Sequence, residues 1–209
     1  MPEIKRTANA GVLIKLDGVT FLLDGVCKEY TEYSYIGTPD YIRKELTDNF
    51  PDVLAFTHWH EDHCDPLYVE IYKKNTLRPV YGPELPIRKK IKDITFMSVV
   101  NRHIGKFTDP HVSYIIEGSK CIWFMGDSSP LSWKNISNYP TPDIVIVPYA
   151  YAITDSAWKI TNDLGAKEII LLHLPKEEDD QFSLWDAVAN TTKNDKRLFI
   201  PKIGEVLTF

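Results

Sequence analysis

The sequence predicts an α/β protein with mixed β-sheets. Segments typical of strands and of helices alternate along all 209 residues, as they do in layered α/β domains. Hairpin signals near the N-terminus and in the middle of the chain add antiparallel pairs to the parallel pairs that such alternation produces. No linker-like or low-complexity stretch divides the chain, so we expect a single domain over residues 1–209.

The first half of the chain predicts a hairpin followed by a helix, a strand and a second helix. Asp17-Gly18 separates two apolar segments and is a two-residue turn signal for a hairpin. Pro39 opens a segment whose apolar residues recur at helical spacing, and Asp65-Pro66 supplies an N-cap and a first-turn proline for the next helix. In order, the expected elements are strands at 12–16 and 19–24, a helix at 39–50, a strand at 52–56 and a helix at 66–75.

The second half continues the alternation around another hairpin. Gly118-Ser119 is its turn, and Gly165 is placed to end a helix that begins near Thr154. The cationic segment 87–93 is interpreted as the solvated face of a helix, and the acidic run 176–180 as a solvated loop. The expected elements are strands at 94–100, 111–117, 121–127, 143–148, 168–174 and 205–209, and helices at 154–165 and 183–192.

Composition limits the kinds of partner. The net charge of −5 and the pI near 5.7 do not suggest a surface that coats nucleic acid. No apolar run approaches the roughly 18 residues of a membrane span, and the N-terminus has no signal-peptide core. Three cysteines lie far apart, as in reduced proteins. We therefore expect a cytoplasmic protein with a small-molecule substrate, no nucleic acid and no membrane; its oligomeric state is open.

Half of the six histidines fall within one hexapeptide, HWHEDH, at 58–63. His58 and His60 are two residues apart, a loop spacing that lets both side chains reach one ion, and the spacing excludes the helical HExxH motif. Asp62 and His63 are adjacent to each other and would point elsewhere, toward a second ion. Imidazole and carboxylate are natural zinc ligands, so the loop is interpreted as half of a two-metal site.

Later strand ends supply the remaining candidates. His58, His103, Asp127 and His173 each lie at or just after the end of an apolar segment, where side chains on a rigid frame can converge on one site. Taken singly, Asp127 fits a turn residue and His173 a hydrogen-bonded core histidine. Taken together with the hexapeptide, a metal site is the better interpretation.

The hexapeptide resembles the H-x-H-x-D-H signature of the metallo-β-lactamase superfamily. The later "FMGD" and "ILLHLP" are similar to its bridging aspartate and last histidine, and the resemblance extends over nearly the whole chain. It implies a four-layer αββα sandwich of two mixed β-sheets flanked by helices, and a metal-dependent hydrolase. A looser similarity, around 147–175, is to the branch of small bacterial metal-dependent hydrolases that includes ascorbate-6-phosphate lactonase.

The resemblance also implies roles for individual residues. His103 is preferred as the middle ligand, with His111 kept as the alternative because it begins the next strand. Asp24 resembles a family aspartate beneath the metals that orients a ligand histidine, although a plain turn aspartate is equally consistent. The implied ligands are His58, His60 and His103 for the first ion, Asp62, His63 and His173 for the second, and Asp127 as the bridge.

The expected chemistry is hydrolysis by hydroxide generated between two Zn²⁺ ions, with Mn²⁺ or Fe²⁺ as alternative metals. Asp62 would orient the nucleophile or carry its proton. Esters, lactones, thioesters and phosphoesters are all accessible to this chemistry, so the substrate stays open. Three alternatives remain: a nucleic-acid phosphodiesterase, a non-catalytic metal-binding protein, and an iron redox site of the flavodiiron type. His60 departs from the H-x-E-x-D-H pattern that the last of these resembles.

Overall fold

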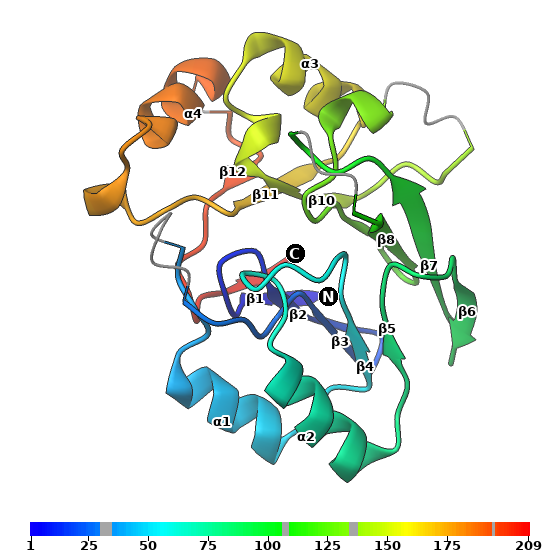
Figure 1. The fold of residues 1–209 in the computed structure, drawn as a ribbon. Helices are drawn as coiled ribbons and strands as arrows, with labels where there is room; N and C mark the ends of the chain where they lie inside the picture. Colours follow the sequence, from blue (N-terminus) through cyan, green and yellow to red (C-terminus); the bar gives the residue numbers. More distant parts are fainter. Residues whose placement is uncertain (30–34, 106–108, 134–137, 194) are drawn as a thin grey trace.

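Two β-sheets pack face to face, with a pair of helices on each outer side (Figure 1). The structure is a computed structural model and describes residues 1–29, 35–105, 109–133, 138–193 and 195–209. In chain order, α1 (Asp40–Asp48) and α2 (Pro66–Thr76) cover one sheet, and α3 (Asp155–Asp163) and α4 (Leu184–Thr192) cover the other. The predicted four-layer αββα sandwich is confirmed.

The first sheet is built mainly from the N-terminal half of the chain. Its strands β13-β1-β2-β3 are antiparallel, whereas β3-β4-β5 are parallel and are connected through α1 and α2. Asp17 and Gly18 both have positive φ, as a tight two-residue hairpin turn requires, and they join β2 to β3 as predicted. The strands are β1 (Glu3–Arg6), β2 (Val12–Leu16), β3 (Val19–Leu23), β4 (Val53–Ala55), β5 (Val80–Tyr81) and β13 (Val206–Thr208).

The second sheet has the order β12-β11-β10-β9-β8-β7-β6. Its β9–β12 half is parallel and its β6–β9 half is antiparallel, so both sheets are mixed as predicted. The strands are β6 (Arg88–Ile91), β7 (Ile94–Asn101), β8 (His111–Glu117), β9 (Cys121–Phe124), β10 (Ile144–Pro148), β11 (Glu168–Leu172) and β12 (Leu198–Phe199); short 3₁₀ turns cover Pro130–Trp133, Tyr149–Tyr151 and Glu177–Asp179.

Two of the predicted helix starts, those of α2 and α3, are confirmed by side-chain caps. The Asp65 carboxylate accepts a hydrogen bond from the Leu67 amide at 3.0 Å, and Pro66 occupies the first turn, where its missing N–H costs nothing. The Thr154 hydroxyl accepts from the Ala157 amide at 3.2 Å. Gly165 has a φ of +76° and follows the end of α3, which is the left-handed position that favours glycine.

The prediction of a helix at 87–93 is wrong. Arg88–Ile91 is the edge strand β6, which pairs antiparallel with β7. Cationic side chains suit such an edge because they discourage pairing with a further strand. The sequence pattern did not separate these two cases, since a lysine-rich run is common on solvated helices and on exposed strands alike. Among the described residues, no helix has the length and apolarity that crossing a bilayer requires.

The core between the sheets contains an aromatic cluster. Phe96 from β7 stacks on Tyr114 from β8 with ring centroids 5.0 Å apart, and it contacts Phe21 and Tyr81 of the facing sheet at 5.4 and 5.6 Å. Phe21, Phe96 and Tyr114 are fully buried. The Tyr114 hydroxyl donates to the Phe56 carbonyl at 2.8 Å, which attaches the second sheet to the segment that follows β4.

We expect Phe96→Ala to lower the free energy of unfolding by about 3–5 kcal/mol, because it opens a cavity between the two sheets. Val100→Ala is the matched control, since Val100 lies on the same strand and is 63% exposed; its change should stay within about 0.5 kcal/mol. Urea denaturation followed by circular dichroism measures both. Equal losses for the two variants would contradict the placement of Phe96 in the shared core.

Candidate metal centre

The HWHEDH loop leaves β4 and lies beside the loops that follow β3, β7, β9 and β11. Two isolated bridges hold these loops together. Val26, after β3, pairs with Cys64, and His103, after β7, pairs with Ser128, after β9. The Asp65 amide also donates to the Val26 carbonyl at 2.9 Å. Residues that are distant in sequence therefore meet at one end of the sandwich.

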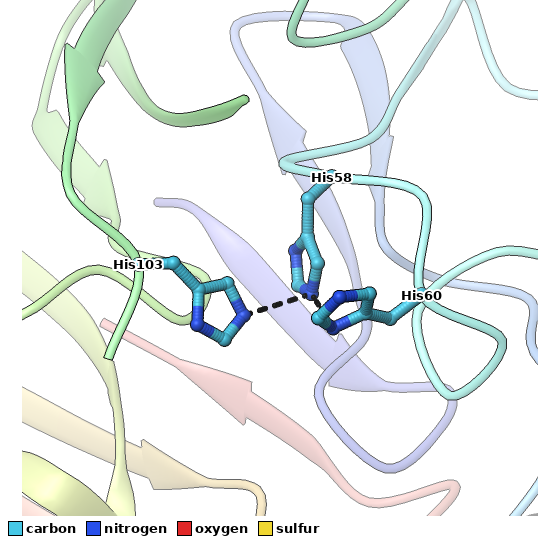
Figure 2. A group of neighbouring side chains, drawn as sticks. All are labelled: His58, His60 and His103. Carbon is cyan, nitrogen blue, oxygen red and sulfur yellow. Dashed lines mark hydrogen bonds between the residues drawn. The ribbon is translucent and has the colours of Figure 1, made fainter. Parts of the chain in front are cut away.

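The first group consists of three histidines whose rings turn toward one another (Figure 2). His58 Nε2 lies 3.0 Å from His60 Nδ1 and 3.3 Å from His103 Nε2. Two nitrogens that each bind one tetrahedral zinc at about 2.0–2.1 Å are about 3.3–3.4 Å apart, so the spacing suits a single ion. His58 and His103 are buried, and His60 is partly exposed.

The second group lies directly beside the first and contains Asp62, His63 and His173. His63 Nε2 is 3.1 Å from His173 Nε2, and Asp62 Oδ2 is 3.2 Å from the same His173 atom. Asp127 Oδ2 lies between the groups. It is 3.5 Å from His63 Nε2, 3.4 Å from His173 Nε2 and 3.7 Å from His103 Nε2. All seven predicted ligand residues are therefore brought together.

Hydrogen bonds assign the proton positions in the first group. Thr57 Oγ1 donates to the Asp24 carboxylate at 2.6 Å, so it accepts from His58 Nδ1 at 3.0 Å. His103 Nδ1 donates to the Ile104 carbonyl at 2.6 Å. Both Nε2 atoms then carry lone pairs, and these face each other at 3.3 Å. A cation between them would bind both lone pairs, so the donor set fits a metal ion.

The burial and charge of these residues also favour a bound metal ion. Burial lowers the pKa of His58 and also that of His103. Both rings are therefore neutral, and each can offer a lone pair to a metal ion. Burial alone would raise the pKa of Asp127, but His173 and His63 outweigh it and hold that pKa well below its usual range. The Asp127 Oδ1 atom is buried and has no hydrogen-bond partner. A buried carboxylate with an unused oxygen is costly unless a cation compensates it.

Asp24 lies beneath this array and is completely buried. Its carboxylate accepts from the Thr57 amide at 2.7 Å, from the Thr57 hydroxyl at 2.6 Å and from His63 Nδ1 at 2.8 Å. The last bond puts a proton on His63 Nδ1 and turns Nε2 toward His173 and Asp62. Asp24 thus orients a histidine of the second group directly, and one of the first group through Thr57.

His111 is placed differently from His103. Its Nδ1 donates to Asn101 Oδ1 at 2.5 Å, and its Nε2 accepts from the Asp127 amide at 2.9 Å. Burial lowers the pKa of His111 to about 3, in keeping with a neutral ring that donates on one side and accepts on the other. Both of its nitrogens are therefore engaged by the protein, and the ring positions the backbone of Asp127.

Sequence reasoning missed a contribution from the loop between β1 and β2. The Asn9 side-chain amide donates to Asp62 Oδ2 at 3.4 Å, and the Asn9 carbonyl accepts from the His173 amide at 3.2 Å. His173 has a φ of +65°, an uncommon backbone conformation for a histidine, and this bond helps to hold it. Buried Arg6 fixes the loop by donating to the carbonyls of Ala8, Asn9 and Pro201. An asparagine among small residues gives little signal of such a role.

A cavity of about 1130 Å³ opens onto the two groups. His60, Asp62, His103, Asp127 and His173 form part of its lining, so a ligand in the cavity reaches both groups. Tyr35 also lines it and packs the edge of its ring against His173 at a centroid distance of 4.5 Å. Neither Tyr35 nor this contact was anticipated from the sequence.

No protein-family model and no curated protein matches the sequence. Solved structures do match. A possible metal-dependent hydrolase from Veillonella parvula DSM 2008 has a TM-score of 0.72 at 15% identity, over 100% of both chains. Igni18, a metallo hydrolase from Ignicoccus hospitalis, has a TM-score of 0.67 at 17% identity, over 100% of this chain and 98% of its own. The metallo-β-lactamase fold protein YhfI from Bacillus subtilis has a TM-score of 0.64 at 17% identity, over 99% of this chain and 98% of its own. The chain therefore has the metallo-β-lactamase fold.

We expect Asp24→Asn to weaken binding of a divalent metal by about 10–100-fold, because the histidine it orients loses its fixed proton position. Asp52→Asn is the matched control: Asp52 likewise accepts from a threonine amide and hydroxyl, those of Thr20 at 3.0 and 2.9 Å, but lies away from the site. Competition with a chelating dye measures the affinity. Unchanged affinity in a folded Asp24→Asn protein would contradict the role of Asp24.

Proposed function

We propose that this chain is a hydrolase that uses two divalent metal ions to cleave an ester, lactone, thioester or phosphoester. One observation carries the proposal: two groups of three ligand-type side chains lie side by side, and Asp127 Oδ2 lies within 3.7 Å of both. Sites with two ions about 3.5–4 Å apart support hydrolysis of this kind. The two solved structures described as hydrolases share this fold, which supports the proposal.

The proposed ligand sets follow the geometry. His58, His60 and His103 would hold the first ion, and Asp62, His63 and His173 the second. The Asp127 carboxylate would be shared between the ions. When bound, such a pair of ions supplies Lewis acidity and brings the pKa of water toward 7.

The chain's own residues would carry the proton and position the substrate. Burial raises the pKa of Asp62, but its hydrogen bond with His173 and the charge of His63 outweigh burial and lower it, so the group is ionised. The Asp62 carboxylate lines the cavity and can accept the proton of the attacking water. The Asn9 amide, 3.4 Å away, limits the orientations of that carboxylate.

The identity of the metal and the branch of the superfamily are also proposals. Zinc is the favoured metal because imidazole and carboxylate are its usual ligands, with manganese or iron as the alternatives. We also propose that the chain is related to the branch that includes ascorbate-6-phosphate lactonase; the looser resemblance of residues 147–175 supports this proposal and names no substrate. A small-molecule substrate and a cytoplasmic location remain expectations from the sequence.

Metal content separates the two candidate middle ligands. We expect the wild-type protein to bind about two ions per chain, His103→Ala to bind about one and lose at least about 100-fold in activity, and His111→Ala to keep close to two. Elemental analysis measures the content, and p-nitrophenyl ester, lactone, thioester and phosphodiester substrates measure activity. Retention of two ions in His103→Ala, with loss in His111→Ala, would reverse the assignment.

The same measurements test the proposal as a whole. Hydrolysis that a chelator abolishes and zinc restores is the expected result. Bound iron without hydrolysis of any substrate would indicate redox chemistry instead. Bound zinc without hydrolysis would indicate a non-catalytic metal-binding protein, and a clear preference for nucleic-acid phosphodiesters would indicate a nuclease.

A further inference from the structure

The lining of the cavity combines two kinds of side chain. One kind is the metal-site residues, and the other is aromatic or aliphatic side chains from widely separated parts of the chain. Its volume of about 1130 Å³ exceeds the roughly 300–1,000 Å³ of common ligand pockets, so a substrate larger than the reacting group fits. The main apolar contributors are Trp59, Ile104, Tyr149, Ile153, Phe182 and Leu184.

Trp59 is a preformed wall of this cavity although 46% of it is exposed. Its indole N–H donates to Glu84 Oε1 at 2.5 Å, and its ring contacts Phe56 at a centroid distance of 5.5 Å. Gly82 leaves room for the ring, because a Cβ there would lie 2.3 Å from Trp59 Cζ2. The ring is thus held in place before any ligand arrives, which lowers the entropy cost of binding.

Phe182 is another large apolar side chain at the cavity, and it is 69% exposed. The Asp180 carboxylate accepts from the amides of Phe182 and Trp185 at 3.2 and 2.9 Å, which orders the loop that carries the ring. Phe182 therefore offers exposed apolar surface to a ligand in the cavity.

Beyond the metal site, the charges of the lining repel an anionic tail. Apart from the metal-site residues, the charged side chains among the described lining residues are Glu61 and Asp179, both acidic. The chain as a whole carries a net charge of −5. Near the metal site, the hydroxyls of Tyr35 and Tyr149 are hydrogen-bonded to each other. The lining therefore offers apolar surface and neutral polar groups.

We infer that the substrate is a neutral carboxylic ester, lactone or thioester with an aliphatic or aromatic tail, and that phosphoesters and other anions are disfavoured. This inference rests on the proposed hydrolase function and names its substrate class. In the reaction, the oxygen of water forms a bond to the carbonyl carbon and the bond from that carbon to the leaving oxygen or sulfur breaks. The proton that water loses passes to the leaving group, which gives a carboxylic acid and an alcohol or thiol. The tail lies against Trp59 and Phe182.

Matched substrates test the inference in the zinc-loaded protein. We expect kcat/KM for p-nitrophenyl hexanoate to exceed that for p-nitrophenyl acetate by at least about tenfold, since added methylenes gain apolar contact. Mono-p-nitrophenyl adipate has a tail of the same length that ends in a carboxylate, and we expect at least about a tenfold loss relative to the hexanoate. Bis(p-nitrophenyl) phosphate should be the poorest of the four.

Binding to the metal-free protein gives a readout independent of turnover. Hexananilide should bind more tightly than adipic acid monoanilide in calorimetric titrations. Phe182→Ala should reduce both this preference and the chain-length dependence of kcat/KM. Leu131→Ala is the matched control, because Leu131 is also a large exposed side chain, at 64%, but does not line the cavity. Asp179→Lys should improve the adipate ester relative to the hexanoate, whereas Asp186→Lys on α4 should not.

The outcomes separate this inference from the hydrolase proposal. If no carbonyl or phosphorus substrate is turned over, the hydrolase proposal fails, and equal binding of the two anilides would then overturn the inference as well. If turnover occurs but the adipate or phosphate substrates are preferred, or acetate and hexanoate are equivalent, the hydrolase proposal stands and the substrate class is wrong.

Discussion

Asp24 follows β3 with no exposed surface, and its carboxylate receives three hydrogen bonds from the loop that follows β4. A buried carboxylate is costly unless it is paired and hydrogen-bonded, so these contacts constrain the whole loop rather than one side chain. Through Thr57 they reach His58, and directly they reach His63. The orientation of both ligand groups thus depends on one buried charge beneath them, which belongs to neither group.

The topology explains why such an arrangement is available here. β3 and β4 are parallel neighbours in one sheet, and β9, β10 and β11 are parallel neighbours in the other, so their carboxyl ends face the same end of the sandwich. Loops that leave these strands start from a buried frame, which limits where their first side chains can point. Asp127 follows β9 and His173 follows β11; each meets the HWHEDH loop without any long connection having to fold back.

Most of the fold and much of the candidate site could be predicted because their signals are local. The hairpin at Asp17-Gly18, the caps at Asp65 and Thr154 and the histidine hexapeptide are each determined within a few residues. Asn9 could not be predicted, since its contacts to Asp62 and His173 cross the chain. The roles of His103 and His111 also needed coordinates: both lie at strand ends, and only their hydrogen-bond partners distinguish them.

Trp59 and Phe182 differ in how closely they are tied to the ligand-type side chains. Trp59 shares the HWHEDH loop with His58 and His60 and donates to Glu84, whereas Phe182 lies on a separate loop that hydrogen bonds to Asp180 order. Exchanging Phe182 therefore changes the apolar lining of the cavity without touching the hydrogen bonds that orient the histidines. A change to Asp24, by contrast, alters the orientation of histidines in both groups at once. Under the proposed function, substitutions on such a loop would change the substrate range while the ligand-type residues stay the same.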